Sequence, residues 1–293
     1  MSTVNALLYY SAPLVEHGRE DDWVIDAVSA PPEVLYNFRK IAIEAEITNL
    51  RESADFHPTL DRAGFEMLAA PSRVDQSALL DGSTSSLETY QHETEALLKS
   101  LTNADAVVFF DATFRREDAS APAESANIRS AHLRVHVDQN PRSARARAIN
   151  HGSADARRFR RFQIINIWRP LIEPVRNFPL AFCDYASIDP AADLVPTRLN
   201  YPEWLKDREN YSLKHSSAHR WYYWEALSPD EVVIFKCYDS ACRDLPSIGD
   251  GDTHDMSMDV AGLCPHTAFF DENGPRTGRL RTSLEMRALL FYV

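Results

Sequence analysis

Basic charge, long apolar runs and paired cysteines are scarce in this sequence. Its 31 Lys and Arg face 43 Asp and Glu, for a net charge of −12, which argues against a general nucleic-acid binder. No apolar run reaches the roughly 18 residues that a membrane span needs, so we expect no membrane partner. The first twenty residues lack the basic and apolar regions of a signal peptide.

The cysteines show no metal-type or redox-type spacing. None of the four forms a CxxC pair, and we expect reduced thiols and a cytoplasmic protein; they are Cys183, Cys237, Cys242 and Cys264. What the sequence does contain is an ordinary globular composition, 44% hydrophobic and 25% charged. Its 293 residues, without repeats or low-complexity linkers, suffice for one large domain or two small ones.

Strands dominate the second half of the chain. The stretch 85–103 predicts a helix of about five turns, with Ser85 and Glu88 matching a capping box at its start. Many strands with irregular connections indicate a β-sandwich or barrel with helices packed outside it. The expected strands are Ala6–Tyr10, 104–116, Leu133–Asp138, Phe162–Trp168, Leu180–Asp184, Val232–Tyr238, Thr267–Phe270 and Leu284–Val293, with a turn or helix at Leu60–Met67.

The segment RVHVDQNP, residues 134–141, places a histidine and an aspartate two residues apart. Alternate side chains of a strand share a face, so His136 and Asp138 would point the same way. The pair is compatible with a structural contact, a catalytic dyad or two metal ligands. A lone HxD is a weak signal, but a non-heme Fe(II) site needs two histidines and one carboxylate on one side of the metal. A second histidine is therefore required downstream.

Two later histidines are candidates for that third ligand. His219 lies in SSAHRWYYW, where a histidine among aromatic residues often packs in a core, and His266 lies in CPHTAFFD. The chain ends in RTSLEMRALLFYV, where Arg281 and Ser283 share a strand face with Glu285 and Arg287. Arginine offers a two-pronged donor and serine a hydroxyl, which together suit a carboxylate. Arg281 also fits a surface charge at the start of a strand.

Other polar residues have two readings each. The arginine-rich segment 142–161 fits either a solvated helical face or an anion site near the pocket, with Arg142 nearest to the HxD pair. Asn166 fits either a satisfied polar group of a strand or a hydrogen bond to a co-substrate or substrate. Arg142 or Arg169 could hold a substrate carboxylate. Trp168 and the aromatic run 221–224 fit either a core or a pocket wall.

The order of these motifs resembles that of Fe(II)/2-oxoglutarate dioxygenases. HVDQNPRSARAR, RFQIINIWRPL, AHRWYYW, VVIFKCYDS, CPHTAFFD and RTSLEMRALLFY are similar to segments of the gibberellin-desaturase-like and cephem-methoxylase-related hydroxylases of fungi and bacteria. The resemblance covers residues 55–293 and is strongest over 130–293. Two departures are the 128-residue spacing from Asp138 to His266, which keeps His219 as a rival ligand, and DAT at 111–113, where relatives often have a central histidine.

The resemblance implies a mainly β fold with a double-stranded β-helix (jelly-roll, cupin-like) core. It implies Fe(II) held by His136, Asp138 and His266, with 2-oxoglutarate held by Arg281 and Ser283, and with O2 as oxidant. We expect one domain over 1–293, in which 1–103 is a mixed or helical support region and 104–293 is the core.

The expected activity is oxidation of an unactivated C–H bond in a small natural-product intermediate, including amino-acid-derived ones. Hydroxylation, desaturation and ring closure all remain open, and ascorbate would support the reaction in vitro. The alternatives are an iron oxidase that needs no 2-oxoglutarate and a non-catalytic β-barrel that binds a metal or ligand. A closed structural zinc site normally has four ligands, whereas this sequence offers three. A homodimer is an open expectation.

Overall fold

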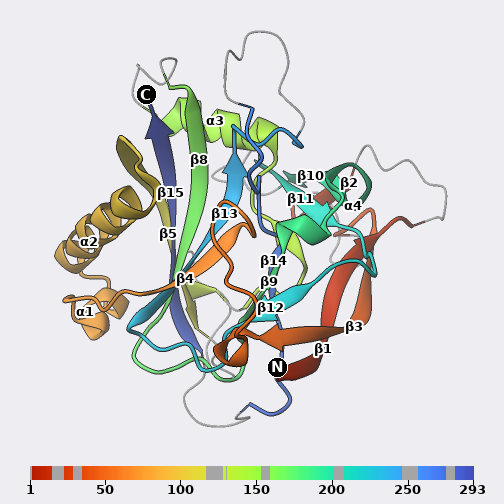
Figure 1. Ribbon diagram of the computed structural model, residues 1–293, viewed down its shortest axis with the longest axis horizontal. Helices are drawn as coiled ribbons and strands as arrows, with labels where there is room; N and C mark the ends of the chain where they lie inside the picture. The colour runs from red at the N-terminus through yellow and green to blue at the C-terminus, as the bar shows by residue number, and fades with distance from the viewer. Residues whose placement is uncertain are drawn as a thin grey trace.

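Two β-sheets face each other in the computed structural model of the chain (Figure 1). The structure describes residues 2–14, 23–28, 35–116, 128–129, 131–152, 159–200, 208–245, 257–274 and 281–293. One sheet has nine strands and the other has six. Within these residues, no helix is long and apolar enough to cross a membrane.

The nine-stranded sheet carries both segments that contain the candidate histidine ligands. Its order is β1 (Thr3–Ala12), β3 (Arg39–Asn49), β12 (Trp221–Tyr223), β9 (Leu180–Cys183), β14 (His266–Ala268), β7 (His136–Val137), β11 (Arg208–Leu213), β10 (Leu194–Asn200) and β2 (Trp23–Asp26). The strand β7 lies between β14 and β11 and pairs antiparallel with both. Segments far apart in the sequence are thus hydrogen-bonded neighbours.

The six-stranded sheet carries the long strands of the chain. Its order is β4 (Phe65–Ala69), β13 (Glu231–Asp239), β8 (Arg161–Pro170), β15 (Thr282–Tyr292), β5 (Ala106–Arg116) and β6 (Ile128–Arg129). Every residue of β8 is buried, because one face of this central strand meets the other sheet and the opposite face meets helices. The expected alternation in β15 is confirmed: Leu284, Met286, Ala288 and Leu290 join the core beneath the helices.

Helices cover the outer face of the six-stranded sheet. They are α1 (Gln76–Leu80) and α2 (Thr84–Thr102), and Figure 1 shows both on the side of β5 and β15 away from the nine-stranded sheet. The remaining helical elements are α3 (Pro141–His151), α4 (Pro190–Asp193) and the 3-10 turns Leu50–Glu52 and Tyr185–Ser187. The capping box expected at Ser85 was wrong by two residues, because Ser83 caps α2 and accepts from the Ser86 amide.

This architecture is the jelly-roll core that the motifs implied, with the main hydrophobic cluster between the sheets and a second cluster between the six-stranded sheet and α2. Strands from both sides of residue 103 pair within both sheets, and the division of the single domain there stays a prediction. The expected turn or helix at Leu60–Met67 is a turn that leads into β4. The four cysteines are free and buried.

Candidate functional site

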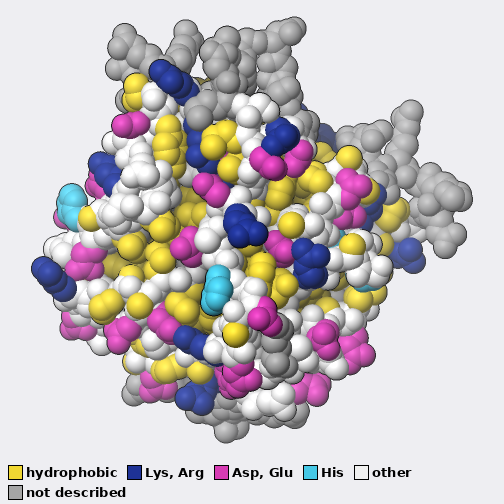
Figure 2. Space-filling model, viewed as in Figure 1, with side chains coloured by type: hydrophobic (Ala, Val, Ile, Leu, Met, Phe, Trp, Pro, Cys, Tyr) yellow, Lys and Arg dark blue, Asp and Glu magenta, His cyan; other side chains and the backbone are white. Residues whose placement is uncertain are grey.

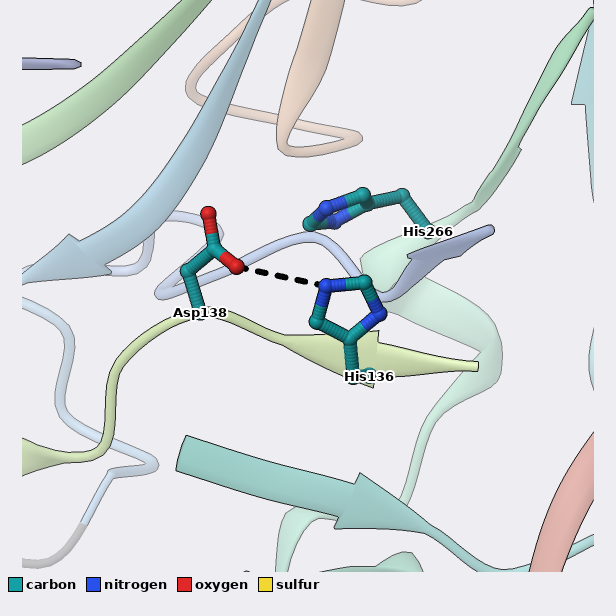
Figure 3. A group of neighbouring side chains, drawn as sticks. All are labelled: His136, Asp138 and His266. Carbon is teal, nitrogen blue, oxygen red and sulfur yellow. Dashed lines mark ion pairs between the residues drawn. The ribbon is translucent and has the colours of Figure 1, made fainter. Parts of the chain in front are cut away.

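The sheet register brings His136 and His266 together. They are direct Cα partners across the β7–β14 pair, and their ring centroids lie 4.5 Å apart. Asp138 follows two residues after His136 and turns to the same side. One ligand atom from each of the three residues lies within 4.8 Å of the others, and Figure 3 shows the three side chains converging. Two imidazoles and one carboxylate on one side match the donor set of non-heme Fe(II) sites.

Backbone carbonyls fix the orientation of both imidazoles. His136 Nδ1 lies 2.8 Å from the Arg134 carbonyl oxygen, and His266 Nδ1 lies 3.1 Å from that of Cys264. A carbonyl oxygen only accepts, so each Nδ1 carries the hydrogen and each Nε2 offers its lone pair. Burial, and then the neighbouring His136, lower the pKa of His266 to about 4. At neutral pH His266 is therefore in the uncharged form that binds metals.

Asp138 reaches from the nine-stranded sheet to two donors of the six-stranded sheet. Its Oδ1 lies 3.2 Å from His136 Nε2, whereas its Oδ2 accepts from Asn166 Nδ2 at 2.8 Å and from Arg287 Nε at 3.0 Å. Burial raises the pKa of Asp138, but the charge of Arg287 and the contact with His136 outweigh it and hold that pKa well below its usual range. Asp138 is thus a carboxylate at neutral pH.

Arg287 joins three carboxylates in the interior. Beside Asp138 it contacts Glu285, two residues earlier in β15, and Asp111 of β5. The register between β5 and β15 shifts after Arg287, and such a bulge changes the direction of a side chain. Sequence reasoning placed Arg287 on the correct face but missed these contacts, because Asp111 and Asp138 are distant in the chain.

His219 lies in another cluster. Its Nδ1 is 3.2 Å from the Tyr10 hydroxyl and its Nε2 is 3.0 Å from Asp193 Oδ2. The ring also stacks on Tyr10, with centroids 5.8 Å apart. Both ring nitrogens are therefore engaged in hydrogen bonds away from the candidate centre, and the structure brings His266 rather than His219 to His136 and Asp138.

A polar row leads along the same interior face to Arg281. Arg281 is 2% exposed. Its guanidinium donates to Ser283 Oγ at 3.2 Å and to the Phe178 carbonyl at 3.0 Å, and lies 5.1 Å above the Trp168 ring. On β8, Asn166 Oδ1 and Trp168 Nε1 are buried without a hydrogen-bond partner among the described residues. These two atoms without partners lie on the part of β8 between Asp138 and Arg281. They suit a polar ligand that reaches from the one residue to the other and hydrogen-bonds to them.

The two arginines that were expected to bind the substrate lie away from the cluster of His136, Asp138 and His266. The Arg142 side chain is 79% exposed and pairs with Glu209 at 3.2 Å. Arg169 lies on the helix-covered face of β8, where it donates to the Tyr90 hydroxyl at 2.8 Å and to two backbone carbonyls. Arg157 and Arg158 of the arginine-rich segment lie outside the described residues.

Two residues beside the centre were missed by the sequence reasoning. Arg147, on the buried side of α3, lies 5.5 Å above the Phe110 ring of β5, next to Asp111. The described part of the chain gives it no carboxylate within ion-pair distance. His132 is exposed, and its ring centroid lies 4.4 Å from that of His136.

Comparisons with known proteins agree with this geometry. A family model described as "Oxidoreductase/YMDC permease-like domain" matches residues 8–291. The hydroxylase/desaturase efuI of Hormonema carpetanum is 28% identical over 99% of this chain and 95% of its own length. The Fe(II)/2-oxoglutarate-dependent dioxygenase nvfI of Aspergillus novofumigatus is 32% identical over 75% of this chain and 70% of its own.

Another relative is aligned over a shorter stretch. Aspirochlorine biosynthesis protein N of Aspergillus oryzae is 35% identical, and this chain spans 59% of its length. Among solved structures, the iron and alpha-ketoglutarate-dependent endoperoxidase NvfI superposes with a TM-score of 0.82 at 25% identity, over 99% of this chain and 98% of that one. With the matched family model, these similarities show that the chain belongs to the Oxidoreductase/YMDC permease-like family and to the Fe(II)/2-oxoglutarate-dependent dioxygenases.

Proposed function

We propose that this protein uses Fe(II), 2-oxoglutarate and O2 to oxidise a C–H bond of a small natural-product intermediate. The observation that carries the proposal is the cluster of His136, Asp138 and His266, whose ligand atoms lie within 4.8 Å of one another. Three ligands on one side of a metal leave its other positions open for reactants. The bound metal with its co-substrate supplies the oxidising chemistry, in which 2-oxoglutarate becomes succinate and CO2.

The chain's own residues supply binding and orientation. His136 and His266 would present Nε2 to the iron, because their Nδ1 atoms are bound to backbone carbonyls. Arg281 and Ser283 would hold the distal carboxylate of 2-oxoglutarate, which suits a buried guanidinium with a hydroxyl beside it. Asn166, whose Nδ2 holds Asp138, retains an orphaned Oδ1 that could accept from a bound ligand.

The charges near the centre support a substrate that carries a carboxylate. With Arg142 exposed and Arg169 on the outer face, Arg147 is the guanidinium that suits a substrate carboxylate. Burial, and then Arg287, lower the pKa of Arg147, which indicates a half-buried cation that an anion would stabilise. A small acid, such as an amino-acid derivative, fits this position beside the Phe110 ring.

The net charge of −12 supports a small-molecule partner rather than nucleic acid. Figure 2 shows acidic and basic side chains interspersed over the described surface of one face, without a broad basic field. A homodimer and a cytoplasmic location remain proposals.

The experiment is a substrate screen with Fe(II), 2-oxoglutarate and ascorbate, in which product and succinate are measured together by mass spectrometry. We expect product and succinate in comparable amounts from the wild-type protein and neither from Asp138→Ala. Product without consumption of 2-oxoglutarate would instead support the iron oxidase. Tight zinc binding, with no succinate under any condition, would support the non-catalytic binding protein.

A further inference from the structure

The two oxygens of Asp138 have different surroundings, which matters if Asp138 is the metal ligand proposed above. Oδ2 accepts from Arg287 Nε at 3.0 Å, Arg287 Nη2 at 2.9 Å and Asn166 Nδ2 at 2.8 Å. Oδ1 faces His136 Nε2 at 3.2 Å. In Figure 3 one oxygen points to His136 while the other points away from both histidines. Three N–H groups thus hold one oxygen on the protein side and leave the other on the histidine side.

The donors to Oδ2 come from two paired strands of the six-stranded sheet. Arg287 of β15 and Asn166 of β8 are direct cross-strand partners, and β8 is buried along its whole length. Asp138 follows β7 of the opposite sheet. The Arg287–Asp138 contact therefore connects the two sheets at the centre and fixes a residue that lies beyond the end of its own strand.

Arg287 is itself fixed in orientation. Its Nη1 contacts Asp111 and its Nη2 contacts Glu285 as well as Asp138. A guanidinium presents its donors in a rigid plane, so three carboxylates around it determine the direction of Nε. Arg115 of β5 belongs to the same cluster, with its Nε 3.7 Å from Glu285 Oε2.

Charge alone does not explain an arginine at this position. A guanidinium beside a metal ligand repels a bound cation. By its charge alone it would therefore lower the metal affinity of the site, and a second contribution to metal binding is needed to explain its place there. We propose that Arg287 is a positioning residue that orients Asp138, presenting Oδ1 to the metal beside His136 and withholding Oδ2. A carboxylate held by one oxygen keeps open the positions that the co-substrate and O2 require.

The test is titration of the metal-free protein with Co(II), followed by calorimetry and by the visible absorption of the bound ion. Arg287→Lys keeps the charge and loses the planar fork, whereas Arg287→Gln loses both. Arg115→Gln is the matched control, because it removes a charge from the same cluster and leaves the Arg287–Asp138 contact intact. We expect both Arg287 variants to bind Co(II) about 10- to 100-fold more weakly, with an altered visible spectrum.

The Arg115→Gln control should not lose affinity for Co(II). Loss of positive charge in Arg115→Gln should leave Co(II) affinity unchanged or stronger, with a wild-type spectrum. Wild-type affinity in Arg287→Lys, or equal affinities in Arg287→Gln and Arg115→Gln, would overturn the positioning role alone. Absence of Co(II) binding by the wild-type protein would overturn the proposed metal site and function as well.

Folding of the metal-free variants is checked by circular dichroism. If Arg287→Gln does not fold because Glu285 loses one of its two guanidinium partners, the comparison becomes Glu285→Gln/Arg287→Gln against Glu285→Gln. These two proteins differ only at the arginine, and the buried charges balance better in the double variant. We expect the double variant to bind Co(II) about 10- to 100-fold more weakly than Glu285→Gln, and equal affinities would overturn the role.

Discussion

Replacement of Arg281 by alanine should weaken 2-oxoglutarate binding far more than any other single change on this face. Arg281 is 2% exposed, and its guanidinium is fixed by Ser283 Oγ, the Phe178 carbonyl and the Trp168 ring. A buried carboxylate that loses its guanidinium partner costs roughly 2–5 kcal/mol. At about 1.4 kcal/mol for each factor of ten, the dissociation constant should rise about 30- to several-thousand-fold.

The assay is calorimetric titration of Mn(II)-loaded protein with 2-oxoglutarate, which needs no knowledge of the substrate. Arg281→Lys should recover little of the affinity, because an ammonium cannot reproduce the fork or the stacking on Trp168. Arg142→Ala is the control, since this side chain is 79% exposed and pairs with Glu209. Its affinity for 2-oxoglutarate should equal that of the wild-type protein.

A wild-type dissociation constant in folded, metal-loaded Arg281→Ala would refute this assignment. The anchor for the distal carboxylate would then have to be another guanidinium of the interior face. Equal losses in Arg281→Ala and Arg142→Ala would refute the reasoning in a different way, because the effect would follow net charge rather than a specific contact.

Two further predictions concern stability. Arg169→Met should lower the free energy of unfolding by roughly 3 kcal/mol, because it leaves the Tyr90 hydroxyl and two partly buried carbonyls without their donor; urea unfolding measures this, and 2-oxoglutarate affinity should stay unchanged. Burial raises the pKa of Asp239, but Lys236 and Arg161 outweigh it and lower that pKa to about 2, against about 3.9 in the unfolded chain. The resulting stabilisation, about 2–3 kcal/mol, is present above roughly pH 4 and is lost as the pH falls towards 2. Asp239→Asn should be less stable at pH 7 and should lose less stability over that acid range, and an unchanged pH profile would contradict the assignment.

Local spacing predicted much of the site. The two-residue period of a strand put Arg281, Ser283, Glu285 and Arg287 on one face of the last strand. In the structure the last three share a face of β15, and Arg281 directly precedes that strand and donates to Ser283 Oγ. The same period separates Asn166 from Arg169, because residues three apart lie on opposite faces. Asn166 points to Asp138 and Arg169 points to Tyr90, so this rule could have excluded Arg169 from the pocket.

Long-range pairing could not be read from the sequence. Whether His219 or His266 opposes His136 depends on which strand pairs with β7, and that depends on how the whole nine-stranded sheet closes. The Arg287–Asp138 contact joins residues of two sheets, and no local pattern encodes it. Strand β3 was missed, although from Ile43 to Thr48 its apolar residues alternate with Glu44, Glu46 and Thr48, which is the period of a half-buried strand.

The most direct test of the central claim is the metal content of four proteins after anaerobic reconstitution with Fe(II) and removal of the excess: the wild type, His136→Ala, His266→Ala and His219→Ala. We expect about one iron per chain in the wild type. We expect the same in His219→Ala, because the wild-type His219 imidazole contacts Tyr10 and Asp193 and not the candidate metal ligands. We expect little or no iron in His136→Ala and His266→Ala. Normal iron in His266→Ala together with loss of iron in His219→Ala would contradict the account.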